Sequence, residues 1–240
     1  QNMSNNDVSA CSLMTDYLDS IGAGKILVDR GPLSFDWTPP NLVGRDEELG
    51  LLASMFMGIG SEGVSGRAVV IGQVGTGKTV LTRRFGEDVI RELDGVRNMT
   101  LSHVNCRNHP STNQVLQQIA LSLDSRHPER GFSSGEIIQS IRRNIRSRGL
   151  HMILVLDEVD VLIRRDNSDL IYKLLRIDEG QGGQGTISLI LVSQDLSLMG
   201  MMEPAIISRL GESNVLKLEP YGYCLLYTSD AADDITCVDL

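Results

Sequence analysis

The chain has 240 residues, of which 41% are hydrophobic, and this is enough apolar material for one large folded domain. Its formal net charge of −9 is not typical of a strong nucleic-acid binder, although a local basic patch is compatible with it. The four cysteines form no CxxC pair, and no apolar run approaches the ~20 residues of a membrane span. We therefore expect a reduced, cytoplasmic setting and no membrane partner.

Residues 1–38 are expected to form an N-terminal segment and linker. A short helix is predicted over 13–21, and the prolines that follow favour an extended, turn-rich stretch. A further helix is predicted over 45–57, because its apolar residues recur on one face. A glycine-rich loop over 58–66 then leads into the main part of the chain.

From residue 68 onward, predicted strands and helices alternate. The expected strands cover 68–71, 101–106, 152–156, 187–192 and 215–218. The expected helices cover 78–93, 111–123, 133–148 and 169–177, the third of them opened by a capping-box pattern at Ser133 and Glu136. Alternation of this kind is typical of a parallel sheet covered on both faces. We predict an α/β domain over residues 39–220, with a five-stranded parallel sheet sandwiched by helices.

Residues 72–79 read GQVGTGKT and match the phosphate-binding loop G-x-x-x-x-G-K-[ST] between a strand and a helix. The glycines let the backbone curl so that its N–H groups face phosphate oxygens, and the helix adds its positive N-terminal end. Lys78 is predicted to bridge the β and γ phosphates, and Thr79 to bind Mg²⁺. The predicted nucleotide-binding residues of this P-loop NTPase are Gly72, Gln73, Val74, Gly75, Thr76, Gly77, Lys78, Thr79 and Val80.

An acid pair, Asp157 and Glu158, directly follows the apolar stretch HMILVL. The strands of a parallel sheet end at the edge where the phosphate loop also lies, so these carboxylates should face the same ligand. Asp157 is predicted to hold the magnesium ion through water, and Glu158 to orient or polarise the attacking water. Asp160 is expected to cap the next segment.

Polar residues also end the strand at 187–192, where Ser193, Gln194 and Asp195 follow. A side chain there could contact both the γ-phosphate and the attacking water. Arg209 follows a short predicted helix, from which it cannot easily reach its own nucleotide. It could reach a neighbour's nucleotide across an interface, where such an arginine is worth ~10³–10⁵ in rate. A solvated surface charge is the alternative for Arg209.

In this order and spacing, the motifs GQVGTGKT, ILVLDEVD, LVSQD and SRLG resemble those of the AAA+ ATPases. The stretches TPPNLVGRDEELGLLASMF and VNCRNHPSTNQVLQQIA narrow the resemblance to the archaeal replication initiators of the Orc/Cdc type, over about residues 30–221. The resemblance implies a module for origin recognition and helicase loading that binds ATP and Mg²⁺, hydrolyses ATP slowly, and is associated with the nucleoid. The partners it implies are double-stranded origin DNA, neighbouring AAA+ subunits and the replicative helicase.

The resemblance also implies roles for single residues. The segment 39–45 would line the adenine pocket, and 107–113 would lie beside the insertion that touches DNA. Gln194 would occupy the sensor-one position and Arg209 that of the arginine finger. The family usually has Asn at sensor one, so the longer Gln194 puts the geometry of the water in doubt. The adenine-pocket candidates are Pro40, Leu42, Val43 and Arg45, and the catalytic candidates are Lys78, Glu158, Gln194 and Arg209.

The family continues beyond residue 221 into a helical lid and a winged helix, through which most DNA contact would be made. Residues 221–240 instead contain four aspartates and no lysine or arginine, and lack the periodicity of a lid helix. We expect a core truncated before the lid and followed by a non-native, adapter-derived tail; a divergent acidic tail is the alternative.

Two other functions stay open. One is a clamp-loader-like or generic AAA+ remodeller. The other is a nucleotide-gated signalling scaffold without significant turnover, against which Glu158 argues because a pure switch has less need of a catalytic acid.

Overall fold

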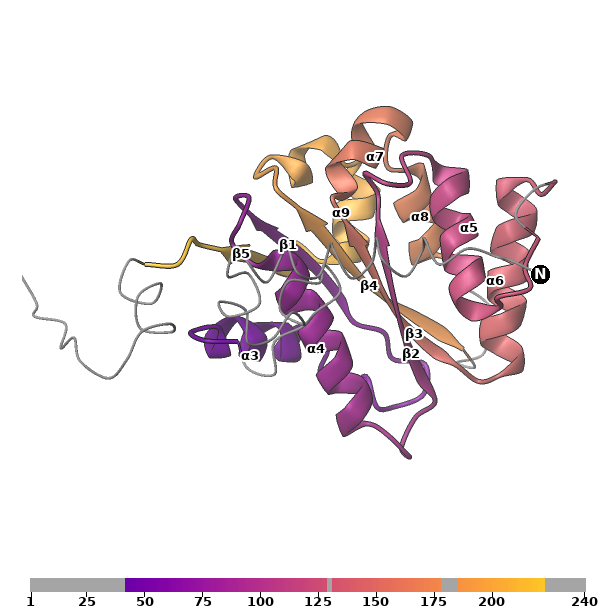
Figure 1. The fold of residues 1–240 in the computed structure, drawn as a ribbon, viewed down its shortest axis with the longest axis horizontal. Helices are drawn as coiled ribbons and strands as arrows, with labels where there is room; N and C mark the ends of the chain where they lie inside the picture. Colours follow the sequence, from indigo (N-terminus) through magenta and orange to yellow (C-terminus); the bar gives the residue numbers. More distant parts are fainter. Residues whose placement is uncertain (1–41, 129–130, 178–184, 223–240) are drawn as a thin grey trace, which may run out of the picture. The chain divides into compact units, whose positions relative to one another are not determined.

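A computed structural model describes residues 42–128, 131–177 and 185–222. The strands within these ranges form one parallel sheet in the order β2-β3-β4-β1-β5 (Figure 1). The strands are β1 (Arg67–Gly72), β2 (Met99–Asn105), β3 (His151–Asp157), β4 (Thr186–Ser193) and β5 (Val215–Leu218). The predicted α/β fold with a five-stranded parallel sheet is confirmed.

The register of the sheet decides which residues meet where the strands end. Asn105 of β2 pairs with Asp157 of β3, and Ile71 of β1 pairs with Ser193 of β4. Because all five strands run in one direction, their carboxyl ends meet at a single edge, which we call the carboxyl edge. The phosphate loop after β1, the acid pair at the end of β3 and Gln194 after β4 therefore lie along this edge.

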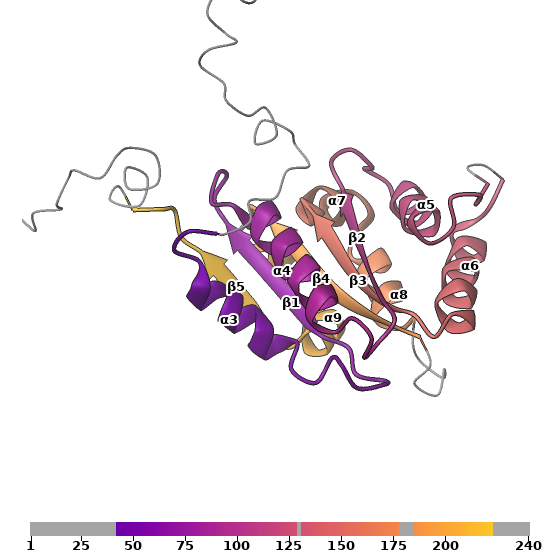
Figure 2. The ribbon, with the colours of Figure 1, turned by 60° about the horizontal axis from the view of Figure 1, so that its bottom comes forward.

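Helices cover both faces of the sheet, as Figures 1 and 2 show. The helices are α3 (Asp46–Met55), α4 (Lys78–Glu92), α5 (Thr112–Leu123), α6 (Ser134–Ser147), α7 (Val159–Asp166), α8 (Asp169–Leu175) and α9 (Pro204–Leu210), with a short 3₁₀ turn, η2 (Leu198–Met201). None of these helices combines the length and the apolar character needed to cross a membrane.

Two cores, one on each face, follow from the alternation of side chains along the strands. On one face, Val70 and Val155 pack with Leu81 and Phe85 of α4 and with residues of α3. On the other face, Leu154 packs with residues of α5 to α9. Every residue of β3 and β4 is buried, because these two central strands are covered on both sides. The resulting sheet is a rigid support for the loops at its carboxyl edge.

Most predicted elements are confirmed to within two residues at each end, and β5 is confirmed over its full range. The capping box is also present, because the Ser133 side chain accepts from the Glu136 amide while the Glu136 carboxylate accepts from the Ser133 amide. The expectation for Asp160 is wrong: the residue lies in the first turn of α7, whose N-cap is Glu158. Arg209 likewise lies within α9 and not after it.

Some predictions fall on residues that the structure does not describe. These are the helix over 13–21, the boundary between residues 38 and 39, Pro40, and the tail beyond residue 222.

Candidate nucleotide-binding site

The phosphate loop connects β1 to α4 at the carboxyl edge. Gly75 and Gly77 have φ angles of 82° and 83°, in the left-handed region that side chains disfavour. Gly77 is the N-cap of α4, and the first turn of this helix contains no acidic residue. The first amides of α4 thus have neither an intrahelical acceptor nor a side-chain cap. The loop therefore presents N–H groups and a positive helix end, which together favour an anion.

Lys78, the first residue of α4, lies against the backbone of the loop. Its Nζ donates to Gly72 O at 2.8 Å and to Gln73 O at 2.7 Å. Burial lowers the pKa of the Lys78 ammonium, and the negative charges of Asp157, Glu158 and Asp160 partly offset that effect. The ammonium group of Lys78 is thus close enough to the acid pair to interact with its negative charge.

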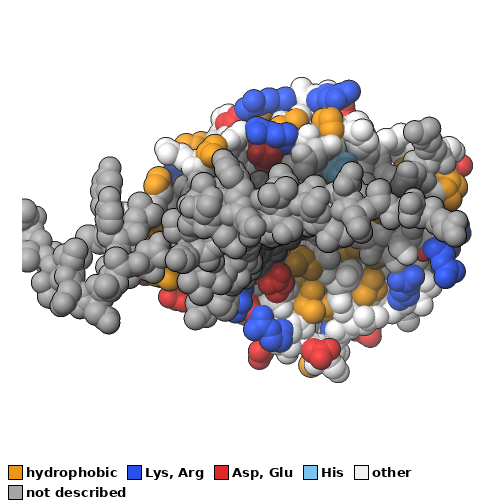
Figure 3. Space-filling view, in the orientation of Figure 1, with side chains coloured by type: hydrophobic (Ala, Val, Ile, Leu, Met, Phe, Trp, Pro, Cys, Tyr) orange, Lys and Arg blue, Asp and Glu red, His pale blue; other side chains and the backbone are white. Residues whose placement is uncertain are grey.

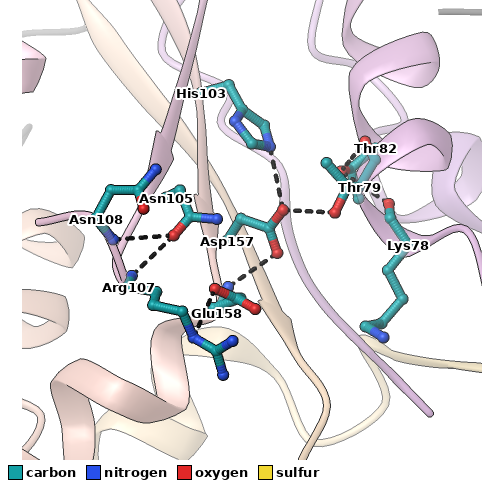
Figure 4. Close-up of polar contacts among 9 residues, drawn as sticks. All are labelled: Lys78, Thr79, Thr82, His103, Asn105, Arg107, Asn108, Asp157 and Glu158. Carbon is teal, nitrogen blue, oxygen red and sulfur yellow. Dashed lines mark hydrogen bonds and ion pairs between the residues drawn. The ribbon is translucent and has the colours of Figure 1, made fainter. Parts of the chain in front are cut away.

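Thr79 and Asp157 come together directly, as Figure 4 shows. The Thr79 hydroxyl donates to Asp157 Oδ2 at 2.6 Å, and the other carboxylate oxygen accepts from the Glu158 amide at 2.8 Å. Asp157 is only 3% exposed. Burial alone would raise the pKa of its carboxyl, but the contacts with His103 and Thr79 outweigh burial and hold the pKa below its ordinary value. Asp157 is therefore an ionised, oriented carboxylate beside the phosphate loop.

His103 of β2 is a site residue that the sequence did not indicate. Its Nε2 lies 3.5 Å from Asp157 Oδ2, on the side of the carboxylate away from Glu158 (Figure 4). His103 stands two residues before Asn105, the β2 residue in register with Asp157. Only this register brings the imidazole to the carboxylate, and a single sequence contains no direct signal for it.

Glu158 has a left-handed backbone with φ 53° and ψ 40°, which is uncommon for a residue with a side chain. Its Oε2 lies 3.3 Å from Nε of Arg107, which follows β2. Arg107 is held in turn, because its amide donates to Asn105 Oδ1 at 2.8 Å. The structure thus pairs Arg107 with the candidate catalytic acid; the predicted place of 107–113 beside a DNA-touching insertion stays a prediction.

Beyond the acid pair, a buried hydrogen bond joins α7 to the end of β4. The Ser193 hydroxyl donates to Asp160 Oδ1 at 3.0 Å, and the Asp195 amide donates to the Ser193 hydroxyl at 2.9 Å. Asp195 also pairs with Arg164 of α7. Gln194 stands half-buried between the two anchored residues, so the backbone at the predicted sensor-one position is held on both sides.

The segment predicted to line the adenine pocket begins the described chain. Leu42 packs against the core on the α4 face, while Val43 is 52% exposed. Arg45 is only 5% exposed, and its Nη2 donates to Thr76 O at 3.1 Å and to Glu219 O at 2.8 Å. Its guanidinium is therefore beside the phosphate loop, and its contact with an adenine base stays a prediction.

Arg209 lies apart from the phosphate loop of its own chain. Arg67, at the start of β1, donates through Nη1 to Arg209 O at 2.6 Å. The last turn of α9 is thus near the end of β1 opposite to the carboxyl edge. The Arg209 guanidinium lies 5.9 Å from the centre of the Tyr172 ring. Its predicted action on a neighbouring subunit stays a prediction.

The oxygen atoms at the carboxyl edge suit an Mg²⁺ ion that is shared with substrate phosphates and water. They do not suit a metal whose ligands all come from the protein. Among the described residues, no group of three or more His, Cys, Asp or Glu side chains is arranged to hold a metal. Thr79 and Asp157 offer hard oxygen atoms 2.6 Å apart. Mg²⁺ sites of this kind use one or two protein ligands and complete their shell with water and substrate phosphates. These two residues are therefore the candidates that could hold the ion.

Comparisons with known proteins agree with this geometry. Residues 64–202 match the model of the family described as "AAA domain". The chain is 30% identical over 226 residues to an ORC1-type DNA replication protein 2 of Saccharolobus solfataricus, covering 92% of this chain and 54% of the relative. It is also 30% identical over 222 residues to an ORC1-type DNA replication protein of Desulfurococcus amylolyticus, covering 90% and 56%. The chain thus spans about half the length of the curated relatives it matches.

Solved structures agree as well. The structure of the Aeropyrum pernix ORC1 protein in complex with DNA superposes with a TM-score of 0.70 at 29% identity, covering 84% of this chain and 52% of that one. The ADP form of the Aeropyrum pernix ORC2 protein gives a TM-score of 0.75 at 23% identity, covering 84% and 55%, which supports the fold. The chain belongs to the AAA domain family, and the predicted resemblance to archaeal Orc/Cdc-type replication initiators is confirmed.

Proposed function

We propose that this chain is the ATP-binding and slowly hydrolysing AAA+ module of a DNA replication initiator. One observation carries the proposal. The hydroxyl of Thr79, at the start of α4, donates to the buried carboxylate of Asp157 at 2.6 Å. The phosphate loop and the acid pair therefore share one site, as metal-assisted hydrolysis of a phosphoanhydride requires.

The residues of this site take distinct roles in the proposal. The loop amides and Lys78 hold the phosphates, and Thr79 and Asp157 hold Mg²⁺. When bound, Mg²⁺ neutralises charge on the phosphates and helps to orient them. Glu158 orients the attacking water and accepts its proton, and its position directly after Asp157 supports this role. Gln194, between two anchored residues at the end of β4, positions the same water.

The replication role comes from the relatives, which are named ORC1-type DNA replication proteins. One similar structure is of an ORC1 protein in complex with DNA, which supports double-stranded origin DNA as a partner. On the face in Figure 3, basic side chains occur in separate groups with acidic ones among them. We propose that this module contributes few DNA contacts and that a winged helix elsewhere in the protein makes most of them.

Assembly with other subunits completes the proposal. The last turn of α9 lies near the start of β1, at the end of this strand opposite to the phosphate loop, so Arg209 would act on the nucleotide of a neighbouring AAA+ subunit. ATP would then close an interface between subunits and act as an assembly switch. The replicative helicase is a further partner of this assembly, in the cytoplasm and near the nucleoid.

Calorimetry and a turnover assay test the site. The chain should bind MgATP, and Lys78→Ala should weaken that binding at least about tenfold because it removes a cation from the phosphates. Glu158→Gln should keep the binding and slow hydrolysis by about 10²-fold or more, since it removes the proposed proton acceptor. The matched control is Glu47→Gln on the exposed start of α3, which should change neither quantity. Absence of MgATP binding by the unaltered chain would refute the proposal.

A second candidate function is a nucleotide-gated scaffold without significant turnover. The ion pair between Arg107 and Glu158 favours it, because a paired carboxylate is less available to a water molecule. The same turnover assay separates the two functions. Equal and negligible rates for the unaltered chain and for Glu158→Gln, with MgATP binding intact in both, would favour the scaffold.

A further inference from the structure

We propose that Arg45 is a positioning residue for the phosphate-binding backbone, and that it links nucleotide binding to the chain segment after β5. The inference rests on the proposed function, because it assumes that the loop holds a nucleotide phosphate. Arg45 precedes α3 and lies 31 residues before Thr76, yet its buried guanidinium reaches that residue of the loop. The same Nη2 atom reaches Glu219, which lies after β5.

Arg45 holds the peptide unit between Thr76 and Gly77. The described chain has no cis peptide bonds, and in a trans peptide the C=O and N–H point in opposite directions. Arg45 Nη2 donates to Thr76 O at 3.1 Å. The N–H of Gly77 therefore points away from Arg45, and Gly77 is the N-cap of α4, where the proposed phosphate site begins. Arg45 thus orients an anion-binding amide without itself touching the anion.

The other cation on the loop cannot replace Arg45 in this role. Lys78 contacts the carbonyls of Gly72 and Gln73, earlier in the loop, and its long flexible stem can turn toward a phosphate. Arg45 is 5% exposed and is fixed by several partners at once. Its Nη1 donates to Glu48, which balances its charge. Arg45 therefore holds the Thr76 carbonyl whether or not Lys78 moves.

Arg45 also contacts the segment Glu219–Gly222. Arg45 Nη2 donates to Glu219 O at 2.8 Å, and the guanidinium lies 4.2 Å from the centre of the Tyr221 ring. At this distance the Arg45 cation is attracted to the face of the Tyr221 ring, which is a cation–π contact. One nitrogen atom, Arg45 Nη2, donates to both Thr76 O and Glu219 O. A phosphate that restrains the loop therefore also restrains Arg45, and through Arg45 it restrains Glu219. Nucleotide binding should therefore slow local opening of this segment.

A conservative substitution tests both contacts. Arg45→Lys keeps the charge but loses the planar fork that reaches two carbonyls and Glu48 and stacks on Tyr221. MgATP affinity, measured by calorimetry, should fall about tenfold, the loss expected when a charged donor no longer holds the Thr76 carbonyl. Hydrogen exchange at the amides of Tyr221 and Gly222 should slow several-fold when MgATP binds the unaltered chain, and this ATP-dependent change should disappear in Arg45→Lys.

Two further variants, one test and one control, allow the inference to be tested even if Arg45→Lys folds poorly. Tyr221→Ala leaves Arg45 in place and removes only the ring, so it should weaken MgATP binding about two- to fivefold, as for a partly exposed cation–π contact. Arg91→Lys, at an exposed ion pair on α4, is the matched control and should change neither readout.

The outcomes separate this inference from the proposed function. If the unaltered chain does not bind MgATP, the proposed function fails. If it binds, but Arg45→Lys binds equally well and retains the ATP-dependent protection of Tyr221 and Gly222, the positioning role of Arg45 is wrong. A variant that melts lower yet keeps both readouts would likewise overturn the inference, because it would show a structural role alone.

Discussion

Replacing Gly72 by alanine tests how closely the phosphate loop approaches β5. Gly72 ends β1 and pairs in register with Leu218. A Cβ atom built at this position would lie 2.6 Å from Leu218 O, 3.0 Å from Thr76 Oγ1 and 3.2 Å from Leu218 Cβ. Real Cβ contacts essentially never fall below 3.0 Å, so the backbone of β5 or of the loop would have to move by about 0.4 Å. Forcing an extra carbon into packed structure costs about 1–3 kcal/mol.

Thermal unfolding followed by circular dichroism measures this cost. A loss of about 2 kcal/mol should lower the Tm of a domain of this size by about 4–8 °C. Gly135→Ala is the matched control, since a Cβ atom there meets nothing within 4 Å and the residue lies in α6, where alanine is the better helix former. Its Tm should stay the same or rise. Equal melting of Gly72→Ala and the unaltered chain would refute the close approach.

Two other predictions concern the opposite end of the sheet and the start of α6. Burial, with the nearby Arg97 charge, lowers the pKa of His151 to about 3, from an ordinary value of about 6.5. As the pH falls, His151 is therefore protonated in the unfolded chain before it is protonated in the folded chain. The free energy of unfolding should be at its full value above pH 6.5 and should decline toward pH 3, with a loss of about 2 kcal/mol at pH 5. Urea unfolding at pH 7 and pH 5 should show a smaller decline for His151→Asn, and an identical decline would contradict the assignment. Ser133→Ala should lower the free energy of unfolding by about 1 kcal/mol and the Tm by a few degrees, because it removes the cap of α6. Ser133→Thr should restore the Tm. An unchanged Tm for the alanine variant would show that the cap contributes little.

The sequence predicted the elements whose signals are local. The loop GQVGTGKT binds phosphate only between a strand and a helix, so the predicted bounds of β1 and α4 agree with the structure to within one residue. The capping box located the start of α6 in the same way. Helix α7 was missed because it has only eight residues and directly follows the acid pair, where a solvated turn is equally compatible with the sequence.

Contacts between distant residues could be predicted from sequence only where the parallel sheet itself brings the residues to one edge. The convergence of Thr79 and Asp157 was expected, because both belong to the carboxyl edge of a parallel sheet. The approach of His103 to Asp157 depends on the register of β2, and the bond from Arg45 to the phosphate loop joins residues 31 positions apart. Such contacts depend on side-chain direction in the folded chain, about which local sequence patterns carry no information.

The strand order has a consequence for synthesis on the ribosome. Strand β1 lies between β4 and β5, and its residue Ile71 pairs with Ser193, more than a hundred residues later. At about 5–20 residues per second, roughly 6–25 s pass between the emergence of these two strands. During that interval the apolar β1 has both edges unpaired, which makes the nascent chain prone to aggregation and gives chaperones time to bind it.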